Sequence, residues 1–75
     1  MDFRDRIVID PNIRFGKPCV RGTRISVGDI LGFLANGMSE AEIVTEYAPL
    51  SADDIRAALA FAAAREIRTV TLPAA

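Results

Sequence analysis

Residues 36–55 read NGMSEAEIVTEYAPLSADDI, and they contain two helix starts separated by a proline. Ser39 with Glu42 three positions later is a capping box, in which each side chain satisfies a free backbone N–H of the first helical turn. Ser51 with Asp54 repeats this arrangement. Pro49 disfavours the helical conformation for the residue before it, so the helix that starts after Ser39 has to end there. The pair therefore has the short connection of a helix-turn-helix.

A further helix precedes this pair. Ser26 is a suitable N-cap, and Gly37 suits the left-handed position just past a helix end. The apolar residues between them have the i, i+3, i+4, i+7 spacing of an amphipathic helix. These positions are Val27, Ile30, Leu31 and Leu34, and the residues that we expect the next helix to bury are Ala41, Val44 and Tyr47.

The first 25 residues have the pattern of short strands. The β-branched run 7–9 ends at the turn residues Asp10, Pro11 and Asn12, and 19–25 is a second strand in which Gly22 predicts a bulge. Two short strands are unstable alone, so they either pack on the helices or pair with a second copy. The sequence thus predicts one domain over 1–75 that is mainly α: a basic β arm or hairpin (1–25), a three-helix helix-turn-helix (26–68) and a tail (69–75).

The size of the chain favours association. A domain of 75 residues buries only about 60% of the surface that its unfolded chain exposes, so we expect a homodimer or a partner protein to add stability. Cys19 has no second cysteine to pair with, and no leader opens the sequence, which favours the cytoplasm. The uncharged run 57–64 is much shorter than the roughly 20 residues that span a bilayer, so we expect no membrane segment.

Most catalytic chemistry is missing from the sequence. With no histidine there is neither a histidine base nor a histidine metal site. Glu42 and Glu46 share one helix face, but solvated carboxylates of this kind are common on helices and need a pocket to become catalytic. We therefore expect no enzyme, no metal, no cofactor and no small-molecule substrate.

Charge is distributed unevenly along the chain. Residues 1–25 hold six Lys and Arg against three Asp, a net of +3, and the remainder holds three Arg against seven acidic residues, a net of −4. A cationic arm suits phosphate or an acidic partner, although two of its arginines, Arg21 and Arg24, could instead pair with helix carboxylates. In the third helix Asp53 and Asp54 would oppose DNA, and Arg56 could contact guanine. The candidate phosphate-binding residues are Arg14, Lys17, Arg21, Arg24 and Arg56.

The third helix is apolar on more than one face. Helical spacing gives the core Ile55, Ala58, Leu59 and Ala62, and it leaves an alanine-rich stripe on the opposite side. Small residues permit close approach of another protein, although alanine is also simply a good helix former. The candidate partner or dimer interface comprises Ile7, Ile9, Val20, Ala57, Ala60, Phe61 and Ala64.

Several short motifs occur together at a specific spacing: IVIDP at 7–11, GKP at 16–18, VRGTRISV at 20–27, NGMS at 36–39 and YAPL at 47–50. This combination resembles the bacterial family called domain of unknown function 433, over residues 7 to about 64. The resemblance implies a homeodomain-like helix-turn-helix with an N-terminal β segment. It also implies an antitoxin of the VapB type, encoded beside a PIN-like ribonuclease toxin, with 67–75 as a candidate toxin-binding tail.

Two classes of function follow. The first is a type II antitoxin that neutralises the toxin and binds operator DNA to repress its own operon. The second is a binding protein without that role, either an adaptor that never contacts DNA or a small stand-alone regulator. The acidic start of the third helix favours the adaptor, and the basic arm favours DNA.

Overall fold

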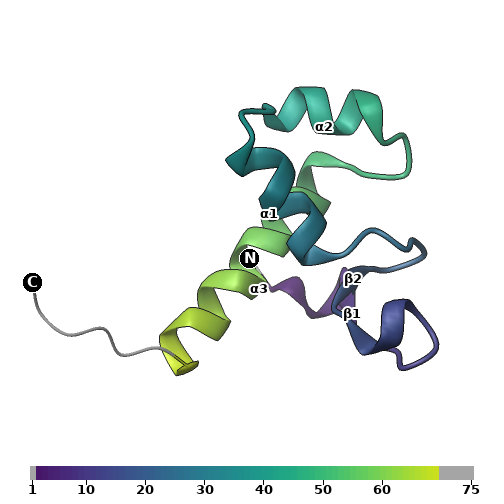
Figure 1. The fold of residues 1–75 in the computed structure, drawn as a ribbon, viewed down its shortest axis with the longest axis vertical. Coiled ribbons are helices and arrows are strands. Elements are labelled where there is room, and N and C mark those ends of the chain that lie inside the picture. Colours follow the sequence, from purple (N-terminus) through teal and green to yellow (C-terminus); the bar gives the residue numbers. More distant parts are fainter. Residues whose placement is uncertain (1, 70–75) are drawn as a thin grey trace, which may run out of the picture.

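The computed structural model describes residues 2–69, with side chains as far as Ile67. Two short 3₁₀ turns and two strands come first: η1 (Phe3–Asp5), β1 (Ile7–Val8), η2 (Arg14–Gly16) and β2 (Cys19–Val20). Three helices follow, α1 (Val27–Ala35), α2 (Glu40–Glu46) and α3 (Ala52–Thr69). Figure 1 shows α2, the strands and the C-terminal end of α3 at three separate extremities of the molecule. The predicted mainly helical fold with an N-terminal hairpin is confirmed.

The predicted helix starts are present as hydrogen-bonded caps. Ser39 Oγ accepts the Glu42 N–H at 3.1 Å, and Glu42 Oε1 accepts the Ser39 N–H at 2.9 Å. Ser51 and Asp54 make the same exchange at 3.2 and 2.9 Å. Ser26 caps α1, and its reciprocal partner is Asp29, which the sequence analysis did not identify. Each helix therefore begins where local side-chain chemistry satisfies its free N–H groups.

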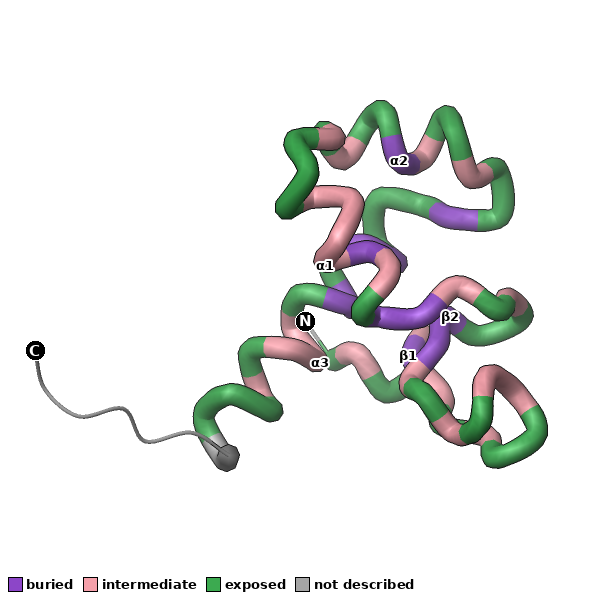
Figure 2. The backbone as a smooth tube through the Cα atoms, viewed as in Figure 1, coloured by how far each residue is buried: buried purple, intermediate pink, exposed green. Residues whose placement is uncertain are grey.

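The core lies where α3 crosses the other elements. Ile30 of α1, Ile43 of α2 and Ile55 of α3 are fully buried and fill its centre. α3 contacts both other helices, β1 and η1, so every layer of the fold packs on this helix. Figure 2 shows buried segments of the strands and of α1 meeting over the first half of α3, while the second half is intermediate or exposed.

The two strands pair within one chain. β1 and β2 are antiparallel, with Ile7 opposite Val20 and Val8 opposite Cys19. The predicted bulge at Gly22 is wrong. Gly22 has a φ of 78° and lies in a tight turn that the Val20 N–H closes by donating to the Ile25 carbonyl. The chain therefore reverses direction after β2, and Ser26 forms an isolated bridge with Cys19 of that strand.

Several predicted burial patterns need correction. Ala57 is fully buried beside Ala58, while Leu59 is 43% exposed. The cause is that α3 packs on helices along one side and on the arm along the other, so its buried face is wider and rotated from the predicted one. In α2, Ala41 is exposed and Ile43 takes the central buried position.

Candidate interaction surfaces

Arg6 connects the arm to the start of α3. Its guanidinium lies 3.0 Å from Asp54 Oδ1 and 3.5 Å from Asp53 Oδ2. The Asp54 side chain is only 11% exposed, and its other oxygen caps Ser51, so both carboxylate oxygens are satisfied. Sequence reasoning missed this contact because its partners stand 48 residues apart. The two acidic residues that appeared to oppose DNA therefore neighbour a cation of the same chain.

Arg14 performs a second connecting role. Its Nη1 donates to Asp29 Oδ2 at 2.9 Å and to the Arg24 carbonyl at 2.7 Å, so it joins the η2 turn to the start of α1. The pKa of Asp29 is lowered, first by the hydrogen bond from the Ser26 N–H and then, against the effect of burial, by Arg14. Arg14 is thus committed to a structural ion pair and is a weaker candidate for phosphate than the sequence suggested.

Three predicted cations remain outside ion pairs in the described part of the chain. Lys17, Arg21 and Arg24 are all exposed. Arg21 Nε donates to the Asp5 carbonyl at 2.9 Å, which orients this side chain without neutralising it. Neither Arg21 nor Arg24 forms an ion pair with a helix carboxylate. The arginines of the arm that do so are Arg6 and Arg14.

Phe15 is an unexpected feature of the same region. It is fully exposed, and it lies in a run of three left-handed residues, Arg14, Phe15 and Gly16, with φ values of 51°, 59° and 82°. For non-glycine residues this conformation costs on the order of 1–3 kcal/mol each. The ring gains no burial that would offset this cost. A phenylalanine beside Gly-Lys-Pro could have been noticed in the sequence, but its exposure follows only from the backbone of the turn.

The helix-turn-helix of α2 and α3 presents mostly acidic side chains. Arg56 Nε lies 3.5 Å from Glu40 Oε1, and the Arg56 side chain is 64% exposed. Glu42 and Glu46 are exposed on α2, and Asp53 is exposed at the start of α3. Arg56 is therefore reachable from solvent, but its guanidinium already pairs with Glu40.

The apolar surface of α3 differs from the predicted stripe. Ile7, Val20 and Ala57 lie in the core, so the chain itself covers them and they offer no surface to a partner. Phe61 packs edge-to-face on Phe3, with ring centroids 5.3 Å apart, so the arm partly covers it. Ala60 and Ala64 are half-buried, and Ile9 is 62% exposed.

A different stripe faces solvent. Leu59, Ala63 and Ile67 follow one another at intervals of four residues, which places them along one side of a helix. Leu59 is 43% and Ile67 85% exposed, and Ala63 is also exposed. Ala60 lies next to them on the helix. We call these four residues the outer stripe.

Comparison with known proteins identifies the family. The family model described as protein of unknown function (DUF433) matches residues 7–62. The chain belongs to the DUF433 family. An uncharacterized protein of Sinorhizobium fredii, y4eO, is 35% identical over 65 residues, which are 87% of this chain and 29% of that protein. The chain therefore spans less than a third of this curated relative.

A solved structure has the same fold. The crystal structure of a DUF433 member protein from Anabaena variabilis superposes with a TM-score of 0.79 at 26% sequence identity. The match covers 87% of this chain and 64% of the other, so the DUF433 fold described above is shared by a family member of clearly different sequence.

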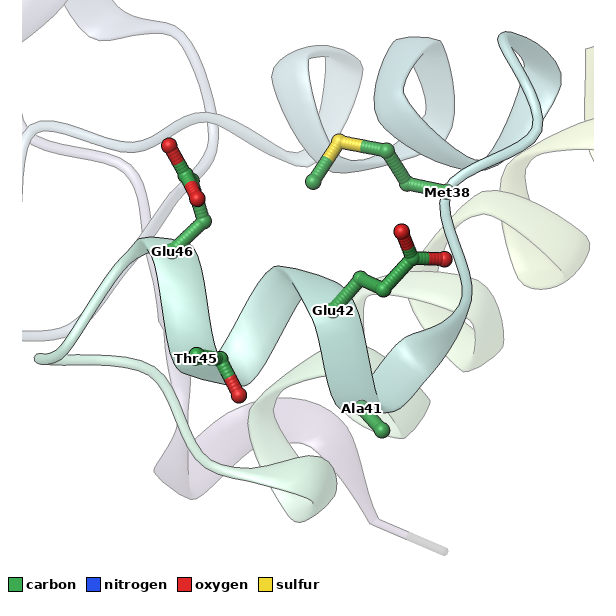
Figure 3. A pocket seen from close by; sticks show the side chains of 5 residues that line it. All are labelled: Met38, Ala41, Glu42, Thr45 and Glu46. Carbon is green, nitrogen blue, oxygen red and sulfur yellow. The ribbon is translucent and has the colours of Figure 1, made fainter.

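A hollow beside α2 of this DUF433 chain leaves its two carboxylates exposed. One shallow pocket of about 290 Å³ is lined by Met38, Ala41, Glu42, Thr45 and Glu46, and Figure 3 shows the Glu42 carboxylate extending from α2 toward Met38 while Glu46 stands further along the helix. The pKa of Glu42 is lowered, because the Ser39 N–H donates to its carboxylate. A general acid at neutral pH would need the opposite shift.

Two further observations concern the described residues alone. Among residues 2–69, no three His, Cys, Asp or Glu side chains gather in a way that could hold a metal ion. Within the same range no helix combines the length and hydropathy needed to cross a bilayer. The tail predicted over 69–75 lies almost entirely outside the described residues, and only the backbone of Thr69 is included.

Proposed function

We propose that this DUF433 chain is the antitoxin of a type II toxin–antitoxin pair, which binds a PIN-like ribonuclease toxin and binds operator DNA to repress its own operon. The observation that carries the proposal is the outer stripe of α3, an apolar helix face that the rest of the described chain leaves partly exposed at Leu59 and largely exposed at Ile67. The family resemblance supplies the class of partner.

The spacing of the stripe fits a known mode of recognition. An amphipathic helix that docks into a groove uses apolar anchors at helical intervals, and Leu59, Ala63 and Ile67 have that spacing. The second half of α3 extends away from the core, as Figure 1 shows, so a partner could enclose it without displacing α1 or α2. A small chain that exposes such a helix end is suited to covering the surface of a larger protein.

The arrangement of surfaces also suits two simultaneous partners. The hairpin with its exposed cations and the C-terminal end of α3 lie at separate extremities in Figure 1. A toxin bound to the outer stripe would leave the cationic arm accessible to DNA, as repression by an antitoxin in complex with its toxin requires.

Co-expression with a PIN-like protein encoded beside this chain tests the proposal. We expect the two proteins to co-purify, and we expect co-expression to restore growth to cells that the PIN-like protein alone arrests. Leu59→Asp with Ile67→Asp should weaken the complex by about 30-fold or more, because interface anchors contribute about 2 kcal/mol or more.

Thr45→Glu provides the control, because Thr45 is exposed on α2, and Figure 1 shows α2 at a different extremity from the C-terminal end of α3. This variant should bind like wild type. Failure to co-purify, or equal binding by the stripe variant and the control, would overturn the proposal.

An adaptor without DNA binding is the second candidate. It is favoured by the acidic side chains on the helix-turn-helix, Glu42, Glu46 and Asp53. Electrophoretic mobility shift at low salt separates the two, because an adaptor gives no shifted duplex even when screening is weakest.

A further inference from the structure

The segment 14–24, RFGKPCVRGTR, contains four cationic residues and no carboxylate. We call residues 14–24 the cationic hairpin; they comprise η2, β2 and the turn after β2 that reverses the chain. One residue of this segment, Arg14, forms an ion pair with a carboxylate, that of Asp29. Lys17, Arg21 and Arg24 keep an uncompensated charge, which favours a polyanionic partner over a neutral one.

The helix-start carboxylates that contact the arm do not pair with these three cations. Asp29 pairs with Arg14 at 2.9 Å, and Asp54 and Asp53 pair with Arg6 at 3.0 and 3.5 Å. Asp5 and Asp10 lie near the two ends of β1 and make no ion pair within residues 2–69, so their carboxylates offset part of the charge of the arm. Among the described residues, segment 14–24 nevertheless keeps three cations without an ion-pair partner, Lys17, Arg21 and Arg24.

The geometry also presents an aromatic ring beside these cations. Arg14 binds the Arg24 carbonyl, so the turn that carries Phe15 is held against the turn that carries Arg24. Phe15 is fully exposed and has a left-handed backbone conformation, so no burial of its ring offsets the cost of that conformation. Conformational strain retained without packing in the monomer is typical of residues that act on a partner. In the sequence this exposed ring lies between Arg14 and Lys17, and proteins that bind duplex DNA use exposed apolar side chains as wedges against base steps.

The helix-turn-helix offers the opposite chemistry. At the start of α3 the exposed Asp53 lies 3.5 Å from Arg6, and Arg56, the one cation in residues 52–60, lies 3.5 Å from Glu40. A recognition helix entering the major groove would bring these carboxylates toward phosphates, which is unfavourable.

We propose that this protein contacts operator DNA through the cationic hairpin and not through α3: Lys17, Arg21 and Arg24 bind backbone phosphates, and Phe15 packs against a sugar or base. Arg14 is a positioning residue that holds the turn. This inference rests on the DNA-binding part of the proposed function. It also assigns toxin and DNA to separate ends of the molecule.

Fluorescence anisotropy with a labelled duplex from upstream of the protein's own gene tests the inference. Binding is measured over about 50 to 200 mM salt, because each phosphate contact contributes about one unit to the slope of log affinity against log salt. Lys17→Ala with Arg24→Ala should lower this slope by about two and weaken binding at least tenfold. Arg4→Ala with Arg56→Ala removes the same charge elsewhere and should leave the slope unchanged.

Phe15→Gly tests the ring separately. Glycine accepts the left-handed conformation, so the turn is retained and only the ring is lost. Binding should weaken about tenfold with an unchanged salt slope, since loss of aromatic contact does not alter the number of phosphates bound. Circular dichroism confirms that each variant is folded.

The outcomes are distinct. If wild type binds no duplex at low salt, both the inference and the DNA part of the proposed function fail, whereas the toxin-binding part is tested independently by co-purification. If wild type binds but the Arg4 and Arg56 variant loses as much slope as the hairpin variant, the inference alone fails. If the hairpin variants lose the PIN-like protein and keep DNA, the hairpin is a protein-binding surface and the inference is overturned.

Discussion

Replacing Arg6 by alanine should weaken the attachment of the arm to α3. The substitution removes the hydrogen bond to Asp54 at 3.0 Å and the weaker contact to Asp53 at 3.5 Å. It leaves the Asp54 carboxylate, 11% exposed, with the Ser51 cap as its remaining described partner. The free energy of unfolding should therefore fall.

The size of this loss can be worked out from the burial of the partners. Hydrogen bonds to charged groups contribute about 1.5–3 kcal/mol, and the lower half of that range applies because the Arg6 side chain is 40% exposed. The Asp53 contact, to a side chain that is 54% exposed, adds a few tenths of a kcal/mol at most. We expect a loss of about 1.5–2 kcal/mol, which for a domain of this size lowers Tm by about 6–16 °C.

Urea unfolding followed by circular dichroism at 222 nm measures the effect, with Arg4→Ala as the control. Arg4 is exposed, and its side chain makes no ion pair within residues 2–69, so its loss should change stability by less than about 0.5 kcal/mol. A double-mutant cycle with Asp54→Asn should give a coupling energy of at least about 1 kcal/mol, because asparagine can still accept from Ser51. Equal stabilities for the Arg6 and Arg4 variants would refute the reasoning.

Three further predictions concern the core, the pH dependence and the strained turn. Ile30→Ala should lower the free energy of unfolding by about 3 kcal/mol because Ile30 is fully buried, while the exposed Ile9→Ala changes it little; similar urea midpoints for the two would contradict this packing. Because the pKa of Asp29 is lowered in the folded state, its stabilising contribution is present above about pH 4 and is lost as the pH falls through the folded-state pKa. Asp29→Asn should therefore flatten the decline of the free energy of unfolding between about pH 5 and 2. If the variant and the wild type give parallel curves of unfolding free energy against pH, this role of Asp29 is excluded. Phe15→Gly should raise Tm, because glycine relieves the left-handed strain of a side chain that packs on nothing, and a lowered Tm would show that the ring stabilises the monomer.

The local part of this fold was predictable. The capping boxes at Ser39 and Ser51 use partners three residues apart, and such short-range contacts fix helix starts wherever they occur. Gly37 ends α1 with a φ of 94°, as the Asn-Gly pair indicated. Strands were expected over 7–9 and 19–25, and the structure has shorter ones at 7–8 and 19–20. The predicted bulge at Gly22 is a turn, because a sequence does not distinguish a bulge from a turn that reverses the chain.

The candidate surfaces were predicted less well. Ala57 and Phe61 have the spacing of a stripe on α3, but whether a stripe faces solvent depends on which elements pack there, and here the arm covers part of it. The outer stripe, with Leu59 and Ile67, emerged only once the rotation of α3 was known. The division of the arginines into structural and unpaired residues likewise depends on distances between Arg6 or Arg14 and distant carboxylates.

By itself the sequence determined the class of fold, the helix boundaries and the uneven charge, since these depend on residue type and on neighbours within one helical turn. The tertiary structure alone decided which cations are neutralised, which face of α3 is covered and that Phe15 projects into solvent. The first two properties arise from contacts between segments up to 48 residues apart, and the exposure of Phe15 arises from the left-handed backbone of its turn.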